Sequence, residues 1–166
     1  ISALGQLSLR GATAEAASGD LNNAGGQLLA GKALTAAVKS IDNRQSGVIS
    51  SAERLQLDVK NALDNRQGRL ESGDSMQVAA HTLQNTGGML ESQQQLGLNV
   101  LTLLNNTDGT VRSNGDQQIA ANQVTNSRGV FSSGGGLTLS AQQLDNPDGM
   151  LIGQKRGDYH VDTLNN

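Results

Sequence analysis

The sequence predicts an all-β protein, a right-handed parallel β-helix (β-solenoid) of about eight coils with 20–21 residues per coil. The first observation behind this prediction is a recurring phrase: an apolar residue, any residue, Asn, two turn residues, Gly, any residue and a second apolar residue. The segment 144–151, Leu-Asp-Asn-Pro-Asp-Gly-Met-Leu, shows the phrase in full. From Gly5 onward, the glycines of successive copies lie 21, 21, 21, 20, 21, 20 and 20 residues apart. A repeat this regular indicates a stack of similar structural units.

The second observation is an alternation of apolar and polar residues after each recurring glycine. The residues eight, ten and twelve positions after the glycine are mostly apolar, as in Leu55, Leu57 and Val59. A period of two places one face of a strand inward and the other outward. No window keeps a helical period, and glycine interrupts the chain about every 20 residues. Each coil is therefore expected to hold short strands of three to six residues, joined by tight turns.

The Asn-x-x-Gly element is expected to form a corner between strands. Asn at the first position and Gly at the fourth suit a type I turn, in which proline is favoured at the second position. Pro147, the only proline of the chain, occupies that second position, and proline is rarely found in an interior strand. Stacked coils would also place one asparagine above the next, where their side-chain amides can bond as in cross-β assemblies. The predicted column is Asn23, Asn43, Asn65, Asn85, Asn106, Asn126 and Asn146.

The chain is expected to be a single β-helical segment, residues 1–166, excised from a longer protein. Residues 21–166 form the regular coils. Residues 1–20 form an irregular first coil, in which smaller residues replace the larger apolar ones of later coils: Ala12, Ala14, Ala16 and Ala17.

The repeat also has faults, and each carries an expectation. Extra residues near Ser46, near 61–62 and near Leu103 predict bulges or longer corners on the surface. Gln117 and Gly157 stand in a column that is otherwise apolar, eight positions after the glycine. Both are expected to weaken the core of their coils.

Composition excludes several classes of protein. A content of 36% hydrophobic residues with 21 glycines would suit a disordered chain, but the apolar residues recur at a fixed phase. The net charge of -3 is scattered and gives no basic patch for nucleic acid or for a membrane surface. Without cysteine there is no disulfide and no Cys-based zinc site. No apolar run approaches the roughly 18 residues of a membrane span.

Few side chains suggest chemistry, and no catalytic, cofactor-binding or metal-binding residue is predicted. His81 and His160 lie at different phases of the repeat, so surface positions are favoured over a metal or catalytic role. Glu71 and Glu91 share one phase and would stack, with Arg112 at the same phase one coil further on. A carboxylate column of this kind can bind calcium or act as an acid and base pair, although a solvated and partly compensated face is the simpler interpretation.

The glycine-rich and glutamine-rich segments have simple interpretations as well. Residues 134–137, Gly-Gly-Gly-Leu, lack the Asp that completes a calcium-binding nonapeptide and are expected to form a polar corner. The pairs at 25–26 and 87–88 are not followed by the Lys and Ser or Thr of a phosphate-binding loop. The glutamines at 93–95 are expected to form a hydrogen-bonding surface at the second corner of the coil.

The repeat units at 63–72 and 124–139 resemble the haemagglutinin repeat of filamentous haemagglutinin-like exoproteins, a family of adhesins and contact-dependent growth inhibition exoproteins. The resemblance covers nearly the whole chain and is weakest in residues 1–20. It implies a right-handed β-helix, two-partner secretion through an outer-membrane transporter, and a filament on the cell surface. It carries over no catalytic residue, because toxin-delivering members hold their activity in a separate C-terminal domain.

Three functions are left open by the sequence. The first is a non-enzymatic shaft segment of a secreted, cell-surface adhesin or toxin-delivery filament, a monomeric rod whose exposed strand edges favour end-to-end association. The second is a segment that binds a receptor or carbohydrate through outward polar columns. The third, a β-helix polysaccharide-degrading enzyme, needs a cleft and clustered acids that the short, uniform loops do not supply.

Overall fold

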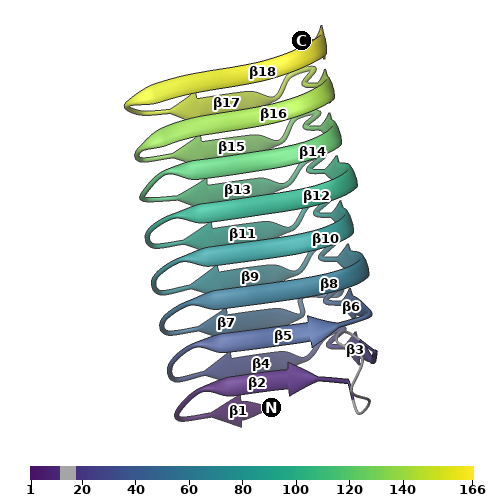
Figure 1. The fold of residues 1–166 in the computed structure, drawn as a ribbon, viewed down its shortest axis with the longest axis vertical. Coiled ribbons are helices and arrows are strands. Elements are labelled where there is room, and N and C mark those ends of the chain that lie inside the picture. The colour runs from purple at the N-terminus through teal and green to yellow at the C-terminus, as the bar shows by residue number, and fades with distance from the viewer. Residues whose placement is uncertain (12–17) are drawn as a thin grey trace.

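The chain winds as a right-handed solenoid in which each coil passes once through a back layer and once through a front layer (Figure 1). The computed structural model describes residues 1–11 and 18–166. Ala12, Ala14, Ala16 and Ala17 lie outside these residues, so the irregular first coil at 1–20 stays a prediction. Among the described residues there is no helix, and hence none that is long and apolar enough to cross a membrane.

Two parallel sheets make up these layers. The back sheet has eight strands: β1 (Ser2–Ala3), β4 (Gln27–Ala30), β7 (Val48–Ser51), β9 (Arg69–Ser72), β11 (Met89–Ser92), β13 (Thr110–Ser113), β15 (Val130–Ser133) and β17 (Met150–Gly153). The front sheet has ten: β2 (Leu7–Arg10), β3 (Asp20–Asn22), β5 (Leu34–Val38), β6 (Ser40–Asp42), β8 (Leu55–Asp64), β10 (Met76–Gln84), β12 (Leu96–Asn105), β14 (Gln117–Thr125), β16 (Gly136–Asp145) and β18 (Arg156–Asn165).

Every strand pair is parallel, and equivalent positions of the repeat face each other. Leu70 of β9 pairs with Leu90 of β11, which pairs with Val111 of β13. The eight strands of the back sheet are separated by seven steps, so the stack completes about seven full turns between β1 and β17. The predicted fold class is confirmed.

The strands of the front sheet are longer than predicted. From β8 onward each is a single strand of 9 or 10 residues, where short strands of three to six residues were expected. The alternating stretch and the segment before the corner asparagine are one strand, because ladder bonds to both neighbouring coils continue through the bend between them. The predicted irregularities lie at this bend: residues 60–61 of β8 and 101–102 of β12 each face the single residue His81 of β10. These are β-bulges, as expected.

The core is the narrow space between the two sheets, and the predicted apolar columns fill it. The column two residues after the recurring glycine is fully buried at Ile49, Leu70, Leu90, Val111 and Phe131. Four further columns from the front sheet close the core from the other side, as in Leu55, Leu57, Val59 and Leu63. The alternation of buried and exposed residues in β8 and β10 shows why a period of two predicts this arrangement.

Gln117 is the one polar side chain in an apolar column of the regular coils. It is fully buried between Leu96 and Leu137, its register partners in β12 and β16. Its Nε2 donates a bond of 3.4 Å to the carbonyl of Val111, whereas its Oε1 has no partner. A buried acceptor without a donor loses its hydration and regains nothing, so Gln117 is still expected to weaken the core of this coil.

Replacing Gln117 with leucine is expected to raise the free energy of unfolding by about 1–3 kcal/mol, because leucine fills a similar volume without an unsatisfied acceptor. Urea denaturation followed by circular dichroism measures the change. The control is Gln118→Leu, one residue further along β14 on its exposed face, where a change within about 0.5 kcal/mol is expected. A loss of stability in Gln117→Leu would show that the amide contributes more than it costs.

Candidate functional site

The recurring asparagines form a continuous hydrogen-bonded ladder inside the corner of the solenoid. Each Nδ2 donates to the Oδ1 of the asparagine in the next coil, over 2.7–2.8 Å at every step from Asn23 to Asn166. The same Nδ2 donates to the carbonyl of the recurring glycine in its own turn, at 3.0–3.3 Å. The side chains from Asn43 to Asn126 are fully buried. The predicted ladder is confirmed, and its role is to satisfy backbone and side-chain groups inside the corner.

The turn at this corner is type II, so the predicted type I turn is wrong. The recurring glycine donates its N–H to the asparagine carbonyl, as in Gly109 to Asn106 at 3.0 Å. In each corner where the glycine lies three residues after the asparagine, the third turn residue has a positive φ, from 53° at Arg128 to 63° at Gly25. A type II turn requires this positive φ, and a type I turn forbids it. The corner that begins at Asn43 has one extra residue, and positive φ at both Gln45 and Ser46 makes it type I′.

The physical reason for this turn lies in the stack. The central peptide of each turn points along the rod axis, and its N–H donates to the central carbonyl of the next coil. Asp108 donates to Ser127, and Arg128 donates to Pro147, each over 3.0 Å. Coil-to-coil bonding therefore holds non-glycine residues in a conformation that costs about 1–2 kcal/mol each. Pro147 lies in the corner as predicted.

Replacing Gln67 with glycine is expected to raise the free energy of unfolding by about 0.5–1 kcal/mol. Glycine relieves the strain of the positive φ, and the greater entropy of the unfolded chain offsets part of this gain. Gln67 has a φ of 58°, and glycine already occupies its place in the next coil, Gly87, at 61°. The reverse change, Gly87→Ala, is the matched control. A Cβ there meets nothing closer than 3.8 Å, so the expected loss in a thermal melt reports backbone strain alone.

The recurring glycine is required for a different reason, which is close approach. A Cβ on Gly109 would lie 2.2 Å from the carbonyl oxygen of Asn85 and 2.5 Å from Oδ1 of Asn106. The corresponding distances are 2.1 and 2.4 Å at Gly129. From Gly47 onward, the glycine of each coil thus lies directly against the asparagine backbone of the coil before it, and no side chain fits between them.

Ion pairs lie on the outside of the corner. Arg44 bonds Asp42 in its own coil at 2.8 Å and lies 3.6 Å from Asp64 in the next. Arg128 bonds Asp108 of the preceding coil through Nε and Nη2, at 2.7 and 2.8 Å. The hydrogen bonds from Arg44 and Arg128 lower the pKa of Asp42 and of Asp108. These pairs are exposed to solvent, so they fix the surface charge pattern and add little to stability.

The other residues considered for chemistry are not brought together. His81 and His160 are both exposed, on β10 and β18. Glu71, Glu91 and Arg112 do stack in register, but Glu71 pairs with Arg69 of its own strand. Within residues 1–11 and 18–166, no three His, Cys, Asp or Glu side chains gather as metal ligands would.

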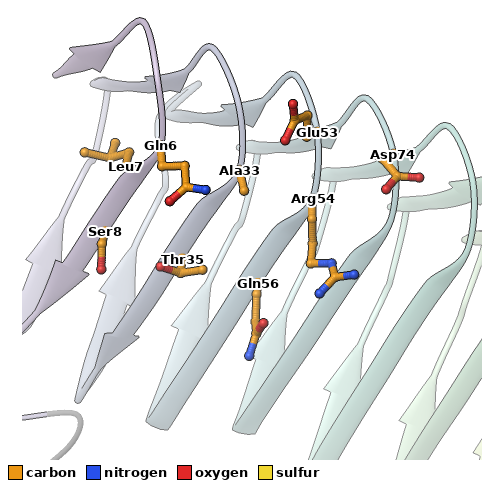
Figure 2. Close-up of a pocket in the computed structure, with 9 residues that line it drawn as sticks. All are labelled: Gln6, Leu7, Ser8, Ala33, Thr35, Glu53, Arg54, Gln56 and Asp74. Carbon is orange, nitrogen blue, oxygen red and sulfur yellow. The ribbon is translucent and has the colours of Figure 1, made fainter.

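The outer face of the front sheet is hollowed near its first strands. An open depression of about 360 Å³ lies there, lined by Gln6, Leu7, Ser8, Ala33, Thr35, Glu53, Arg54, Gln56 and Asp74. Figure 2 shows these side chains spread over successive coils, with Glu53 and Asp74 at the corners and Arg54 further along the face. Apart from Leu7, which packs against the core, they point outward side by side and do not converge on one point, so this arrangement offers a surface and not a reaction centre.

The comparison with family models decides the relationship. The haemagglutinin repeat model matches residues 1–67, 30–116 and 99–154, which together cover nearly the entire chain. The chain belongs to the haemagglutinin repeat family. Neither the curated proteins nor the solved structures contain a match.

Haemagglutinin repeats of this chain contain a second polar column that the sequence analysis missed. Ser51, Ser72, Ser92, Ser113 and Ser133 are buried at the corner where the back sheet crosses to the front. The Oγ of Ser133 shares its one hydrogen between the carbonyls of Gly115 and Gly136, at 2.8 and 3.0 Å. Their constant place, four residues after the recurring glycine, was the available signal. Serine is seldom buried in proteins, so this spacing does not by itself indicate a buried column.

Proposed function

We propose that this chain is a non-enzymatic segment of the shaft of a long secreted filament that stands on a cell surface. The family fits a structural or adhesin segment of the filamentous haemagglutinin type. The observation that carries the proposal is the continuous pairing of equivalent strands through the stack, from β1 to β17 on one face and from β2 to β18 on the other. Such a stack holds its two ends at a fixed separation, because backbone ladders bind every coil to its neighbours.

Within this proposal the filament serves adhesion or contact-dependent toxin delivery, and its partners are an outer-membrane two-partner secretion transporter and a receptor or glycan on a target cell. Repeats that contact only their neighbours can fold progressively as a chain emerges outside the cell. The sequence that flanks this segment in a longer parent protein distinguishes the two roles. A C-terminal toxin module there supports delivery, and its absence supports adhesion.

Rigidity is tested directly by distances between spin labels. The chain has no cysteine, so Ser50→Cys, Ser132→Cys and Ile152→Cys place labels only at outward positions of one column of the back sheet. The backbone separations of the pairs 50/132 and 50/152 are expected to be about 19 and 24 Å, from four and five steps of ~4.8 Å. Narrow distributions with this increment support a shaft. Broad distributions, or equal distances for the two pairs, contradict it.

A further inference from the structure

The corner that connects β13 to β14 contains the only Asn-Gly pair of the chain, Asn114 and Gly115 (Figure 1). An asparagine followed by glycine is the pair most prone to spontaneous deamidation. Glycine has no side chain to shield its amide nitrogen, and it leaves the backbone free to bend toward the preceding side chain. Asn114 is exposed to solvent, so water and base reach its amide. The reactivity of this corner therefore depends on how firmly the stack holds the two residues.

Hydrogen bonds to the preceding coil engage both reacting groups in the folded stack. Gly115 donates its N–H to the carbonyl of Gln94 over 2.9 Å. Nδ2 of Asn114 donates to Oε1 of Gln93 over 2.7 Å. While the Gly115 nitrogen is bonded to the other coil, it is not free to attack the side chain beside it. Deamidation therefore requires the corner to open first.

The core directly behind this corner favours such an opening. Gln117 follows Gly115 by two residues, and its side chain is fully buried. Its Oε1 is the only buried side-chain nitrogen or oxygen among the described residues that lacks a hydrogen-bond partner. Opening returns this oxygen to water, so the coil of Gln117 opens at a lower cost than the coil before it, where Leu96 holds the same position.

The coil that follows also holds the corner loosely. Its own corner, residues 134–136, is Gly-Gly-Gly, so it places no side chain over Asn114. Glycine also loses the most backbone freedom when it becomes ordered. The contacts across are hydrogen bonds, from Gly135 to the carbonyl of Gly115 at 3.2 Å and from Gly136 to Oδ1 of Asp116 at 2.8 Å. A segment held by hydrogen bonds and not by packed side chains belongs to the part of a protein that opens locally.

We propose that Asn114 is a site of spontaneous deamidation, which proceeds when the coil of Gln117 opens locally. A base removes the proton from the Gly115 amide, and the nitrogen attacks Cγ of Asn114. The new N–Cγ bond forms, the Cγ–Nδ2 bond breaks, and the nitrogen of the side-chain amide leaves as ammonia after taking up a proton. Water then hydrolyses either carbonyl of the cyclic imide, which gives aspartate or isoaspartate.

Either product alters the corner. Aspartate at position 114 brings a second carboxylate close to that of Asp116. Isoaspartate adds a methylene group to the main chain, so the corner loses the spacing that pairs Gly115 with Gln94. The inference goes beyond the shaft function, because it identifies one coil of the stack as the place where an ageing rod becomes flexible.

The test is peptide mapping by mass spectrometry after incubation of the whole chain at mildly alkaline pH. In buffer, Asn114 is expected to convert progressively to aspartate and isoaspartate. Asn122, which is also exposed but is followed by glutamine, is expected to stay intact. In urea the conversion of Asn114 is expected to be about ten- to a hundredfold faster, because opening no longer limits the reaction.

Two variants separate opening from chemistry. Gln117→Leu is expected to slow the conversion in buffer by about fivefold or more, because leucine makes opening of the coil more costly. The matched control is Gln118→Leu on the exposed face of β14, which is expected to convert at the wild-type rate. In urea all three chains are expected to convert at the same rate, since the reacting residues are unchanged.

Two results would overturn the proposal. The first is an Asn114 that is still intact in buffer after about a hundred times the half-life measured in urea. The second is an equal rate in buffer for Gln117→Leu and Gln118→Leu. The spin-label distances, measured on freshly prepared protein, test the shaft separately. Normal distances with an unreactive Asn114 would refute only the modification site, whereas abnormal distances would refute the shaft.

Discussion

Gly109→Ala is expected to lower the free energy of unfolding by at least about 3 kcal/mol, the upper range for forcing extra volume into a packed site. The added Cβ would lie 2.2 Å from the carbonyl oxygen of Asn85, far inside contact distance. That oxygen belongs to the backbone of the preceding coil, which ladder bonds hold in register on both sides of the corner. This steric clash can therefore be relieved only if the two coils separate locally.

The matched control is Gly5→Ala, at the same phase of the repeat. A Cβ at Gly5 meets nothing within 4 Å, because no earlier coil of the described chain lies beneath it. Urea denaturation should show a midpoint near that of the wild type for Gly5→Ala and a far lower one for Gly109→Ala. Equal midpoints would mean that the corners are looser than the stack indicates, and that glycine serves only the turn.

Removing one rung of the asparagine ladder is expected to have the second-largest effect. Asn106→Ala takes away the donor for Oδ1 of Asn126 and for the carbonyl of Gly109, and the acceptor for Nδ2 of Asn85. The buried Oδ1 of Asn126 loses its one donor, at a cost of about 1–3 kcal/mol, whereas the carbonyl of Gly109 still accepts from the N–H of Val130 and Nδ2 of Asn85 still donates to the carbonyl of Gly88. With two further bonds lost at about 0.5–1.5 kcal/mol each, the expected loss in the free energy of unfolding is roughly 2–6 kcal/mol.

Asn61→Ala is the control, because Asn61 is exposed at the bulge of β8. Amide hydrogen exchange adds a local measurement. The turn amides of Asp108 and Arg128, which bond to the next coil, should lose protection in Asn106→Ala and keep it in Asn61→Ala. A uniform small loss over the whole chain would instead point to a general packing effect and contradict the ladder as the organising contact of the corner.

The hydrogen bonds that join the corner asparagines and the turn peptides have the same direction along the rod. The asparagine ladder and the stacked turn peptides all donate toward the C-terminal end of the rod, as from Asn85 to Asn106 and from Asp108 to Ser127. Each coil thus offers the same set of donors to the coil that follows. A uniform interface of this kind lets similar units be added without limit, which is the property a long shaft needs.

The sequence alone determined the period of about 20 residues, the direction in which the side chains of the alternating stretch point, and the place of the corner. Leu55, Leu57 and Val59 alternate with polar residues, and a period of two leaves only one way to bury them. The asparagine column followed from the same spacing, since equal phases must stack in a solenoid. The weak core position at Gln117 was visible as an amide in an apolar column.

Only the tertiary structure decided the geometry between coils. Gln67 and Arg128 have no local preference for positive φ, so the type II turn could not be predicted from them; bonds to the next coil impose it. The need for Gly109 comes from a carbonyl 24 residues earlier in the chain, at Asn85. The position of a residue within the repeat shows whether its side chain lies inside the core. The distances between atoms of neighbouring coils are set only when the coils pack against each other.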